Sequence, residues 1–240
     1  MSDIPKRSDG APWRNFYGRR HGKTMRPRQK DLIANYLPGL TPAGIAWHEN
    51  PDRNPVDFGA LVSGTRETWL EIGFGGGEHL LAMAERYPGI AILGCEPFMN
   101  GVAMCLSAHE RKGLSNVRIH AGDAREVFDV ATGADFTRVF VNYPDPWPKT
   151  RHHERRFIGR ENLPHLARII APGGLLHVAS DIPDYIRHTL KAMRPLPEFR
   201  WTAERPADWR EPWSDWPSTR YEAKAMREGR TPCYLTFERV

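Results

Sequence analysis

Short apolar runs alternate with longer amphipathic segments along the chain from residue 68 onward. The apolar runs predict five strands, at residues 68–72, 91–95, 117–120, 138–143 and 175–179. The segments between and after them predict helices at residues 78–86, 99–111, 125–131, 160–170 and 184–193. Two further strands are expected at residues 200–204 and 234–238. Strands that alternate with helices are typical of β-α-β units, so we expect an α/β fold with a mostly parallel seven-stranded sheet flanked by helices.

The first 55 residues lack this alternation and carry the net positive charge of the chain. Residues 1–30 hold nine Lys and Arg residues against Asp3 and Asp9, a charge of 9 − 2 = +7. The whole chain has a net charge of +5, so the other 210 residues sum to −2. We therefore predict a basic, irregular N-terminal arm and linker at 1–55 and one domain at 56–240. Such an arm favours a polyanionic partner, with a solvated tail as the alternative.

Composition excludes several classes of protein. Hydrophobic residues make up 40% and charged residues 26% of the chain, which permits a packed core. No apolar run reaches the roughly 20 residues of a membrane helix, and no signal segment opens the chain. Three scattered cysteines do not form a disulfide framework or a structural zinc site. We expect a soluble, cytoplasmic protein with no membrane or metal partner, and the sequence leaves its oligomeric state open.

A glycine-rich turn follows the first predicted strand, with glycines at 73, 75 and 77. It does not match the dinucleotide spacing G-x-G-x-x-G, because Glu78 stands at the last glycine position. Glu71, two residues before Gly73, would repel a pyrophosphate and attract an ammonium group. S-adenosylmethionine carries an ammonium group and no phosphate. The loop thus predicts a cofactor site for S-adenosylmethionine at Glu71, Gly73, Gly75 and Gly77, with a plain tight turn as the alternative.

Acidic residues also follow the next two predicted strands. Glu96 is placed to accept hydrogen bonds from the two hydroxyls of a ribose, and Asp123 from an adenine amino group. Each could instead cap a helix, and Asp123 is the stronger candidate for a cap. The carboxyl ends of parallel strands meet at one edge of a sheet, so we expect Glu71, Glu96 and Asp123 in one pocket.

The fourth predicted strand runs into Pro144-Asp145-Pro146-Trp147, followed by a basic cluster. The two prolines hold the Asp145 carboxylate at the sheet edge, although an isolated turn of this kind is more often structural. Between residues 149 and 160 there are five Lys and Arg residues and one Glu, a pattern that RNA phosphates would explain. His152 and His153 lie within this cluster, but adjacent histidines rarely ligate one metal ion.

Taken together, these residues resemble the bacterial tRNA (guanine-N7-)-methyltransferase family from about residue 14 to the end of the chain. The motifs that carry the resemblance are Leu70-Glu71-Ile72-Gly73-Phe74-Gly75, Pro144-Asp145-Pro146-Trp147 with Lys149, Arg151-His152-His153-Glu154-Arg155-Arg156, Ser180-Asp181, Thr219-Arg220-Tyr221-Glu222 and Phe237-Glu238-Arg239-Val240. Two departures lie beside the site: Asn142-Tyr143 replaces the family's usual aromatic pair, and Pro148 replaces the common His.

The resemblance implies a Rossmann-like class I methyltransferase fold and methylation of a guanine in the tRNA variable loop at N7, with S-adenosylmethionine as cofactor. It implies cofactor contacts at Glu71, Glu96, Asp123 and Asp145, with Asp145 as the catalytic or base-orienting acid. Substrate contacts are implied at Lys149, Arg151, His152, His153, Arg155, Arg156, Asp181, Thr219, Arg220, Tyr221 and Glu222.

The sequence leaves several alternatives to this function open. A methyltransferase acting on another RNA or on a small molecule would keep the cofactor acids. A non-catalytic RNA-binding protein could share the scaffold but would be expected to have lost some of those acids, which are all present. Four tryptophans, at 201, 209, 213 and 216, could stack on a base, but packing onto the sheet is the favoured interpretation. Deletion of residues 1–30 is expected to weaken tRNA binding and to leave cofactor binding intact.

Overall fold

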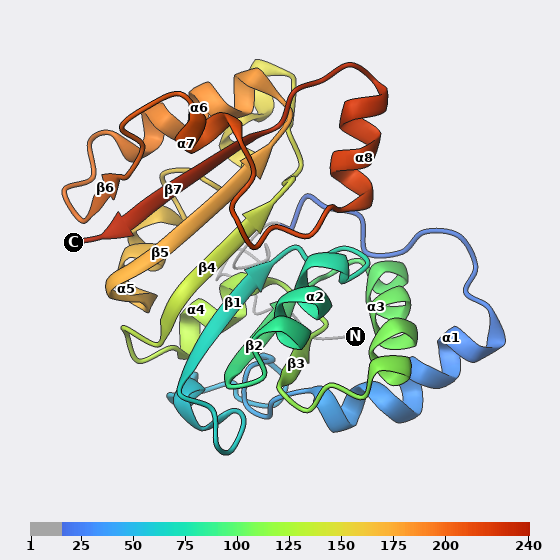
Figure 1. Ribbon diagram of the computed structural model, residues 1–240. Coiled ribbons are helices and arrows are strands. Elements are labelled where there is room, and N and C mark those ends of the chain that lie inside the picture. Colours follow the sequence, from blue (N-terminus) through green and yellow to red (C-terminus); the bar gives the residue numbers. More distant parts are fainter. Residues whose placement is uncertain (1–15) are drawn as a thin grey trace.

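A computed structural model describes residues 16–240 and contains one seven-stranded sheet with the strand order β3-β2-β1-β4-β5-β7-β6 (Figure 1). Strand β7 runs antiparallel to both of its neighbours, and the other pairings are parallel. The strands are β1 Glu67–Ile72, β2 Ile90–Cys95, β3 Val117–His120, β4 Phe136–Asn142, β5 Ile170–Ser180, β6 Phe199–Trp201 and β7 Cys233–Arg239. The predicted mostly parallel sheet of seven strands is confirmed.

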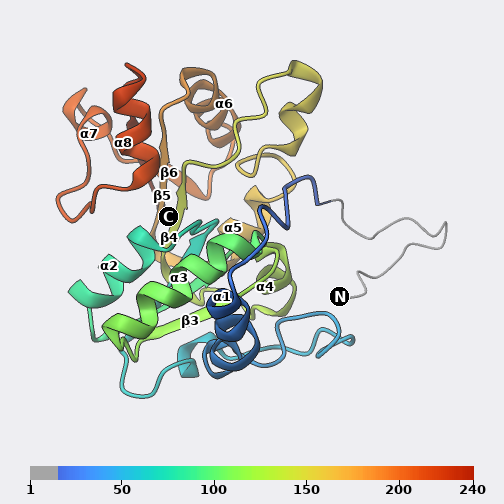
Figure 2. The same ribbon diagram turned by 90° about the vertical axis from the view of Figure 1, so that its right-hand side faces the viewer.

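Helices cover both faces of this sheet (Figure 2). The α-helices are α1 Pro27–Asp31, α2 Glu78–Arg86, α3 Met99–Lys112, α4 Ala124–Val130, α5 Leu163–Ile169, α6 Pro183–Met193, α7 Ala207–Arg210 and α8 Arg220–Arg227. Alternate residues of β1 point to opposite faces, so Trp69 joins the core beneath α2 and α3 while Leu70 joins the core beneath α4, α5 and α6. None of the helices in the described part of the chain has the length and apolar character needed to cross a membrane.

Three predicted elements have other bounds in the structure. The helix expected at residues 160–170 ends at Ile169, because β5 begins at Ile170. Pro172 and the two glycines after it lie inside β5, where we expected a turn before the strand. A register shift in the β4–β5 pairing between Phe136 and Arg138 accommodates this irregular stretch. The strand expected at 200–204 is shorter and ends at Trp201.

The segment after residue 26 is helical, although we predicted an irregular arm and linker. Helix α1 continues into a π-helical turn at Leu32–Tyr36 and a 3₁₀ turn at Leu37–Leu40. Leu32 and Leu37 are buried in the core beneath α2 and α3, and the Tyr36 hydroxyl lies 2.9 Å from His109 Nδ1 of α3. This segment is therefore built onto the sheet domain and wraps its α3 side.

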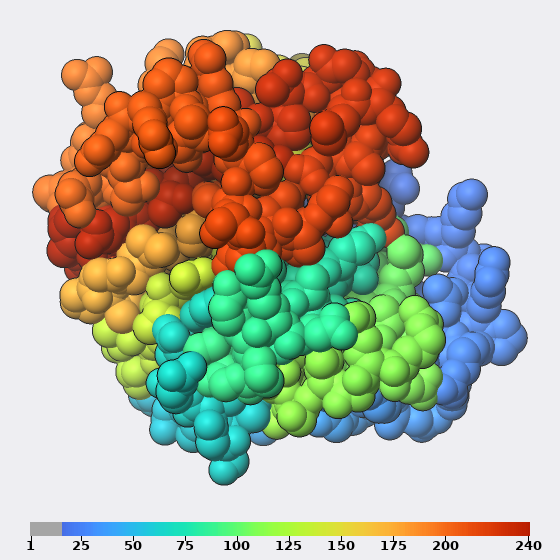
Figure 3. Space-filling view, viewed as in Figure 1, coloured from blue at the N-terminus to red at the C-terminus, as the bar shows by residue number. Residues whose placement is uncertain are grey.

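The segment between β6 and β7, residues 202–232 (orange to red), lies against α2 (teal) in Figure 3. Asp215 fastens it, because its carboxylate accepts from the Tyr87 hydroxyl at 2.8 Å and lies 3.3 Å from Arg138 Nη1. Trp213 and Trp216 both pack edge-on against the ring of Tyr234 in β7. For these two tryptophans the packing interpretation is confirmed, whereas Trp201 is 41% exposed.

Candidate active site

A cavity of about 380 Å³ opens at the carboxyl ends of the central parallel strands. It brings together eight of the predicted site residues: Gly73, Gly75, Glu96, Asp123, Asp145, Arg155, Arg156 and Tyr221. Ten other predicted residues do not line it: Glu71, Gly77, Lys149, Arg151, His152, His153, Asp181, Thr219, Arg220 and Glu222. The acids that follow β2, β3 and β4 therefore converge on one space.

The glycine loop forms one wall and needs its glycines for two different reasons. Gly73 and Gly75 have φ values of +75° and +58°, which L side chains rarely adopt. A Cβ on Gly73 would meet nothing within 4 Å, so its cavity side is open to a ligand. A Cβ on Gly77 would lie 2.4 Å from Cys105 Sγ, and one on Gly101 would lie 2.4 Å from the Gly75 carbonyl oxygen. Gly101, inside α3, was missed by the sequence prediction although a lone glycine in a helix signals close packing.

Glu96 is anchored at the end of β2 by main-chain donors. Its Oε2 accepts from the Gly75 N–H at 2.7 Å and its Oε1 from the Phe98 N–H at 2.8 Å. Burial raises the pKa of Glu96 above its ordinary value, and these two N–H groups oppose that rise. Each oxygen keeps a lone pair, so a fixed carboxylate is available to the two hydroxyls of a ribose.

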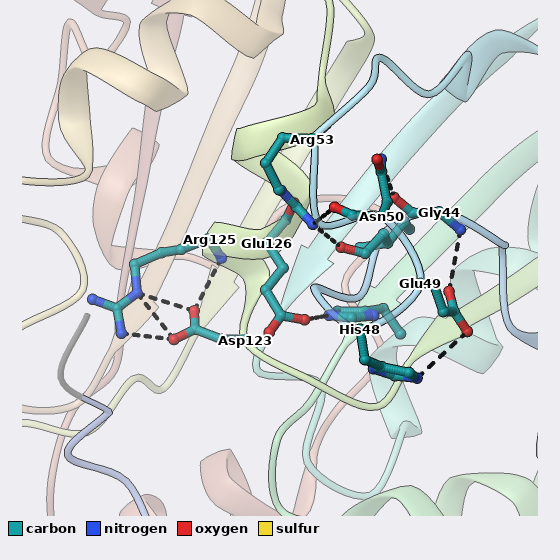
Figure 4. Close-up of polar contacts among 10 residues, drawn as sticks. Gly44, His48, Glu49, Asn50, Arg53, Asp123, Arg125 and Glu126 are labelled. Atoms are coloured by element: carbon teal, nitrogen blue, oxygen red, sulfur yellow. Dashed lines mark hydrogen bonds and ion pairs between the residues drawn. The ribbon is translucent and has the colours of Figure 1, made fainter. Parts of the chain in front are cut away.

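Asp123 is both a helix cap and a cavity residue, so both sequence interpretations apply to it. Its Oδ1 accepts from the Arg125 N–H at 3.0 Å, and the Arg125 guanidinium lies against both carboxylate oxygens at 2.6–3.1 Å (Figure 4). Arg53, in the segment before the domain, donates to the Glu126 carbonyl at 2.6 Å and to the Ile45 carbonyl at 2.9 Å. Arg53 thus stabilises the first turn of α4, although no sequence motif pointed to it.

Glu71 lies beneath the glycine loop rather than on the cavity wall. It is 2% exposed, and its Oε2 lies 2.7 Å from Nδ1 of His79 in α2. β1 pairs with β4 here, so Glu71 stands beside Phe140 on the face covered by α2. A contact between Glu71 and the ammonium group of a cofactor would therefore be made from behind the cavity wall.

Asp145 carries an exposed carboxylate on the cavity wall, and no hydrogen bond or ion pair joins it to another described residue. Tyr143 and Trp147, on either side of it, have φ values of +50° and +41°. Non-glycine residues in this region carry backbone strain, which is concentrated at functional sites. The turn therefore holds a carboxylate that is free to accept from a ligand.

Arg156 holds this turn and does not face solvent. Its side chain is 1% exposed, with Nε donating to the Pro146 carbonyl at 2.9 Å and Nη2 paired with the Asp184 carboxylate. It also lies over the ring of Tyr185. A guanidinium engaged in this way would have to leave its partners to meet a phosphate, so the structure favours a positioning role over the predicted RNA contact.

We expect Arg156→Ala to lower the free energy of unfolding by roughly 2–3 kcal/mol, because buried hydrogen bonds of a charged group are lost. Denaturant unfolding monitored by circular dichroism measures this change. The matched control is Arg151→Ala, whose exposed side chain should alter stability by less than about 0.5 kcal/mol. Equal stability losses for the two variants would contradict the assignment.

The rest of the basic cluster lies in a 3₁₀ turn, Thr150–Arg155, at the mouth of the cavity. Lys149 and Arg151 are exposed. The His152 ring meets Trp147 edge-on, and His153 Nε2 lies 3.6 Å from the Asp184 carboxylate. Arg155 stands over two rings, at 4.5 Å from that of Tyr17 and 5.2 Å from that of Trp147. Arg155 thereby connects the cluster to the N-terminal segment.

Residues 16–19 form a further part of the cavity wall, which no sequence signal predicted. The next residues are pinned to the start of α3: the Met99 N–H donates to the Arg20 carbonyl at 2.9 Å, and the Gly22 N–H to Asn100 Oδ1 at 2.7 Å. Removing residues 1–30 would therefore open the cavity, contrary to the expectation that cofactor binding stays intact. Lys6, Arg7 and Arg14 of the predicted arm lie outside the described residues.

Helix α8 explains the Thr219–Glu222 motif. Thr219 is its N-cap and accepts from the Glu222 N–H at 3.2 Å, the Thr-x-x-Glu pattern that could have predicted this helix. Glu222 Oε1 in turn accepts from Trp216 Nε1 at 2.9 Å and from the Tyr234 hydroxyl. Of the motif, Tyr221 alone lines the cavity.

Two other predicted residues support this region from outside the cavity. Arg220 extends over Gly76 and lies 3.3 Å from Glu78 Oε1, and Asp181 pairs with Arg230. Among the side chains of residues 16–240, no three His, Cys, Asp or Glu are grouped as a metal site requires. The acids, the open glycine cradle and the size of the cavity fit an adenosyl ligand with an amino-acid end.

Comparisons with known proteins agree with this geometry. Residues 65–235 match the model of a family described as "Putative methyltransferase". Over 98% of its length the chain is 55% identical to the tRNA (guanine-N(7)-)-methyltransferase of Ruegeria sp. (strain TM1040), 91% of which is covered. It is also 55% identical to that of Ruegeria pomeroyi, with 99% of both chains covered.

A solved structure shares the fold at low sequence identity. It is a variant of the 16S rRNA (adenine(1408)-N(1))-methyltransferase from Catenulisporales acidiphilia, with a TM-score of 0.52 and 13% identity. The match covers 80% of this chain and 91% of that one. On the strength of the close relatives, the chain belongs to the tRNA (guanine-N7-)-methyltransferase family.

Proposed function

We propose that this protein transfers a methyl group from S-adenosylmethionine to N7 of a guanine in the variable loop of tRNA. The observation that supports it most is the Asp145 carboxylate, which has no partner among residues 16–240 and lines the same cavity as Glu96 and Asp123. Glu96 and Asp123 are oriented by N–H donors, as an adenosine site requires. We therefore assign Glu96 and Asp123 to the adenosine and Asp145 to the guanine.

Chemistry at guanine N7 needs positioning more than proton transfer. N7 has an in-plane lone pair and no proton, so attack on a methyl group requires no general base. When bound, S-adenosylmethionine supplies a methyl group on a positively charged sulfur. Asp145 contributes a negative charge beside the purine as it becomes cationic, and it can accept from the guanine N1–H and amino group. Alignment of this kind supplies several kcal/mol.

Two other acids of the predicted substrate site have partners within the protein. Glu222 accepts hydrogen bonds from Trp216 and Tyr234, and Asp181 pairs with Arg230, so we assign neither acid a role in assisting Asp145. Tyr221 is 45% exposed at the cavity and its ring is stacked on that of Tyr143 at 6.3 Å. The Arg220 guanidinium also lies over the Tyr221 ring, at 5.1 Å. An exposed aromatic side chain on the cavity wall suits contact with an extruded base.

Two basic segments flank the cavity mouth and are suited to RNA phosphates. Residues 16–30, the first four of which line the cavity, carry six Lys and Arg residues and no acid, and Lys149 and Arg151 are exposed at the start of the 3₁₀ turn that follows Asp145 in the chain. We expect Lys149→Ala/Arg151→Ala to weaken tRNA binding and to reduce the slope of log K against log salt by about two. Filter binding over a salt series measures the slope, and calorimetry should show unchanged cofactor affinity. An unchanged slope would remove these residues from the RNA surface.

The decisive experiment is incubation of bulk tRNA with labelled S-adenosylmethionine, followed by nucleoside analysis. Label in 7-methylguanosine supports the proposal. Label in another nucleoside would favour a different RNA target, and no label with intact cofactor binding would favour a small-molecule methyltransferase or a non-catalytic RNA-binding protein. A tRNA substrate also leads us to propose a cytoplasmic location.

A further inference from the structure

A buried histidine lies beneath the glycine loop and contacts Glu71. His79 is in the first turn of α2, and its side chain and that of Glu71 are each 3% exposed. Its Nδ1 lies 2.7 Å from Glu71 Oε2. At this distance Nδ1 is placed to donate a hydrogen bond to the carboxylate oxygen. Glu71 therefore has a fixed partner within the protein.

Aromatic rings lock the orientation of this imidazole. Its centroid lies 4.7 Å from the Phe140 ring at 60°, and 5.0 Å from the Trp216 ring at 38°. Trp216 is itself held by its bond to Glu222. Rotation of His79 would disturb this packing, so the donor is presented to Glu71 in one direction.

The sheet order indicates which end of the cofactor Glu71 serves. Glu96 follows β2 and Asp123 follows β3, and these acids suit the ribose and the adenine. In the order β3-β2-β1-β4, the remaining part of the ligand extends toward β1 and β4. Gly73 lines that end of the cavity, and Glu71, two residues earlier in the chain, lies buried behind it, where its negative charge suits an ammonium group.

We propose that His79 is a positioning residue, which holds the Glu71 carboxylate in the orientation that binds the amino-acid end of the cofactor. This inference rests on the proposed function, because it takes S-adenosylmethionine as the ligand. Without the His79 bond, Glu71 would be a buried carboxylate with no fixed donor. Such a group is free to change rotamer, which moves its charge out of the orientation that attracts an ammonium group.

Binding of two ligands that share an adenosine thioether distinguishes a positioning role of His79 from a role in the stability of the whole cavity. S-adenosylhomocysteine has the amino-acid end, and 5′-methylthioadenosine lacks it. In calorimetry, we expect His79→Leu to weaken S-adenosylhomocysteine binding about tenfold, equivalent to about 1.4 kcal/mol, and to change 5′-methylthioadenosine binding less than twofold. Equal losses for both ligands would overturn the proposal, because they would indicate distortion of the whole cavity.

The chain offers a matched control in His177. This histidine also packs on Phe140, at 5.0 Å, and faces Trp213 at 4.6 Å, but its Nδ1 pairs with the Thr236 hydroxyl. His177→Leu should produce no loss selective for S-adenosylhomocysteine. A selective loss in this variant would show that the effect comes from packing on Phe140 and would contradict the proposal.

Two further variants test the route through Glu71. His79→Asn places an amide donor near the position of Nδ1 and should recover S-adenosylhomocysteine affinity to within about threefold of the wild type; no recovery counts against the proposal. In a Glu71→Gln background, His79→Leu should cost no further affinity, whereas an undiminished tenfold loss would show that His79 acts elsewhere.

The failure of this inference is distinguishable from that of the proposed function. If the wild type binds S-adenosylhomocysteine but forms no 7-methylguanosine in tRNA, the RNA substrate is wrong and the selective effect of His79→Leu still supports the positioning role. If the wild type does not bind S-adenosylhomocysteine, both fall.

Discussion

Asp145→Ala is expected to lower kcat by roughly 10²- to 10³-fold while S-adenosylhomocysteine affinity changes less than about threefold. The reason is that the carboxylate has no partner within the described protein, so its interactions are made with the substrate and strengthen as the purine becomes cationic. Single-turnover kinetics with tRNA measure the rate, and calorimetry measures the affinity.

Asp145→Asn separates charge from orientation. The amide keeps the shape and one acceptor oxygen but loses the negative charge, so we expect activity between that of wild type and Asp145→Ala. Wild-type turnover in Asp145→Asn would restrict Asp145 to orienting the base. Comparable losses of rate and cofactor affinity in Asp145→Ala would refute its assignment to the substrate side.

Gly101→Ala is expected to weaken S-adenosylhomocysteine binding by roughly 10- to 100-fold. The added Cβ would lie 2.4 Å from the Gly75 carbonyl oxygen, so α3 and the glycine loop must move apart. Overpacking of this kind costs about 1–3 kcal/mol, and here it falls on the loop whose Gly75 N–H orients Glu96. Calorimetry with S-adenosylhomocysteine measures the loss.

Thermal stability is a poor readout for this variant, since alanine favours a helix interior by about 1 kcal/mol over glycine and offsets part of the strain. The matched control is Gly39→Ala, where a Cβ would meet nothing within 4 Å and the backbone is not in the left-handed region. Gly39→Ala should bind normally. Unchanged affinity in Gly101→Ala would show that the loop tolerates the displacement.

The sheet and the position of three acids in one cavity were predictable, because both follow from short-range patterns. Apolar runs mark β1 to β4, and the carboxyl ends of parallel strands must meet at one edge, so Glu96, Asp123 and Asp145 could be placed together from sequence alone. The strand pattern alone could not place the Glu71 side chain. Its position depends on which face of β1 the side chain lies on and on its contact with His79 on that face.

Other parts of the site depend on contacts between distant segments. Residues 16–19 reach the cavity because residues 20–22 bind Met99 and Asn100, and no local pattern records that pairing. Arg156 belongs to a cluster of similar charge but is buried by its contacts with Pro146 and Asp184. Charge patterning describes a set of residues and does not show which member turns inward.

Because the cavity lies at the carboxyl ends of the strands, the connections at the amino ends of the strands are the ones whose length and sequence can change. At the opposite edge of the sheet, residues 113–115 and 132–135 connect helices to the amino ends of β3 and β4, and none of them lines the cavity. We expect insertions or peptide tags at these two connections to leave the residues that line the cavity in place. Length differences among related chains should therefore accumulate at that edge, and labels for single-molecule work are best attached there.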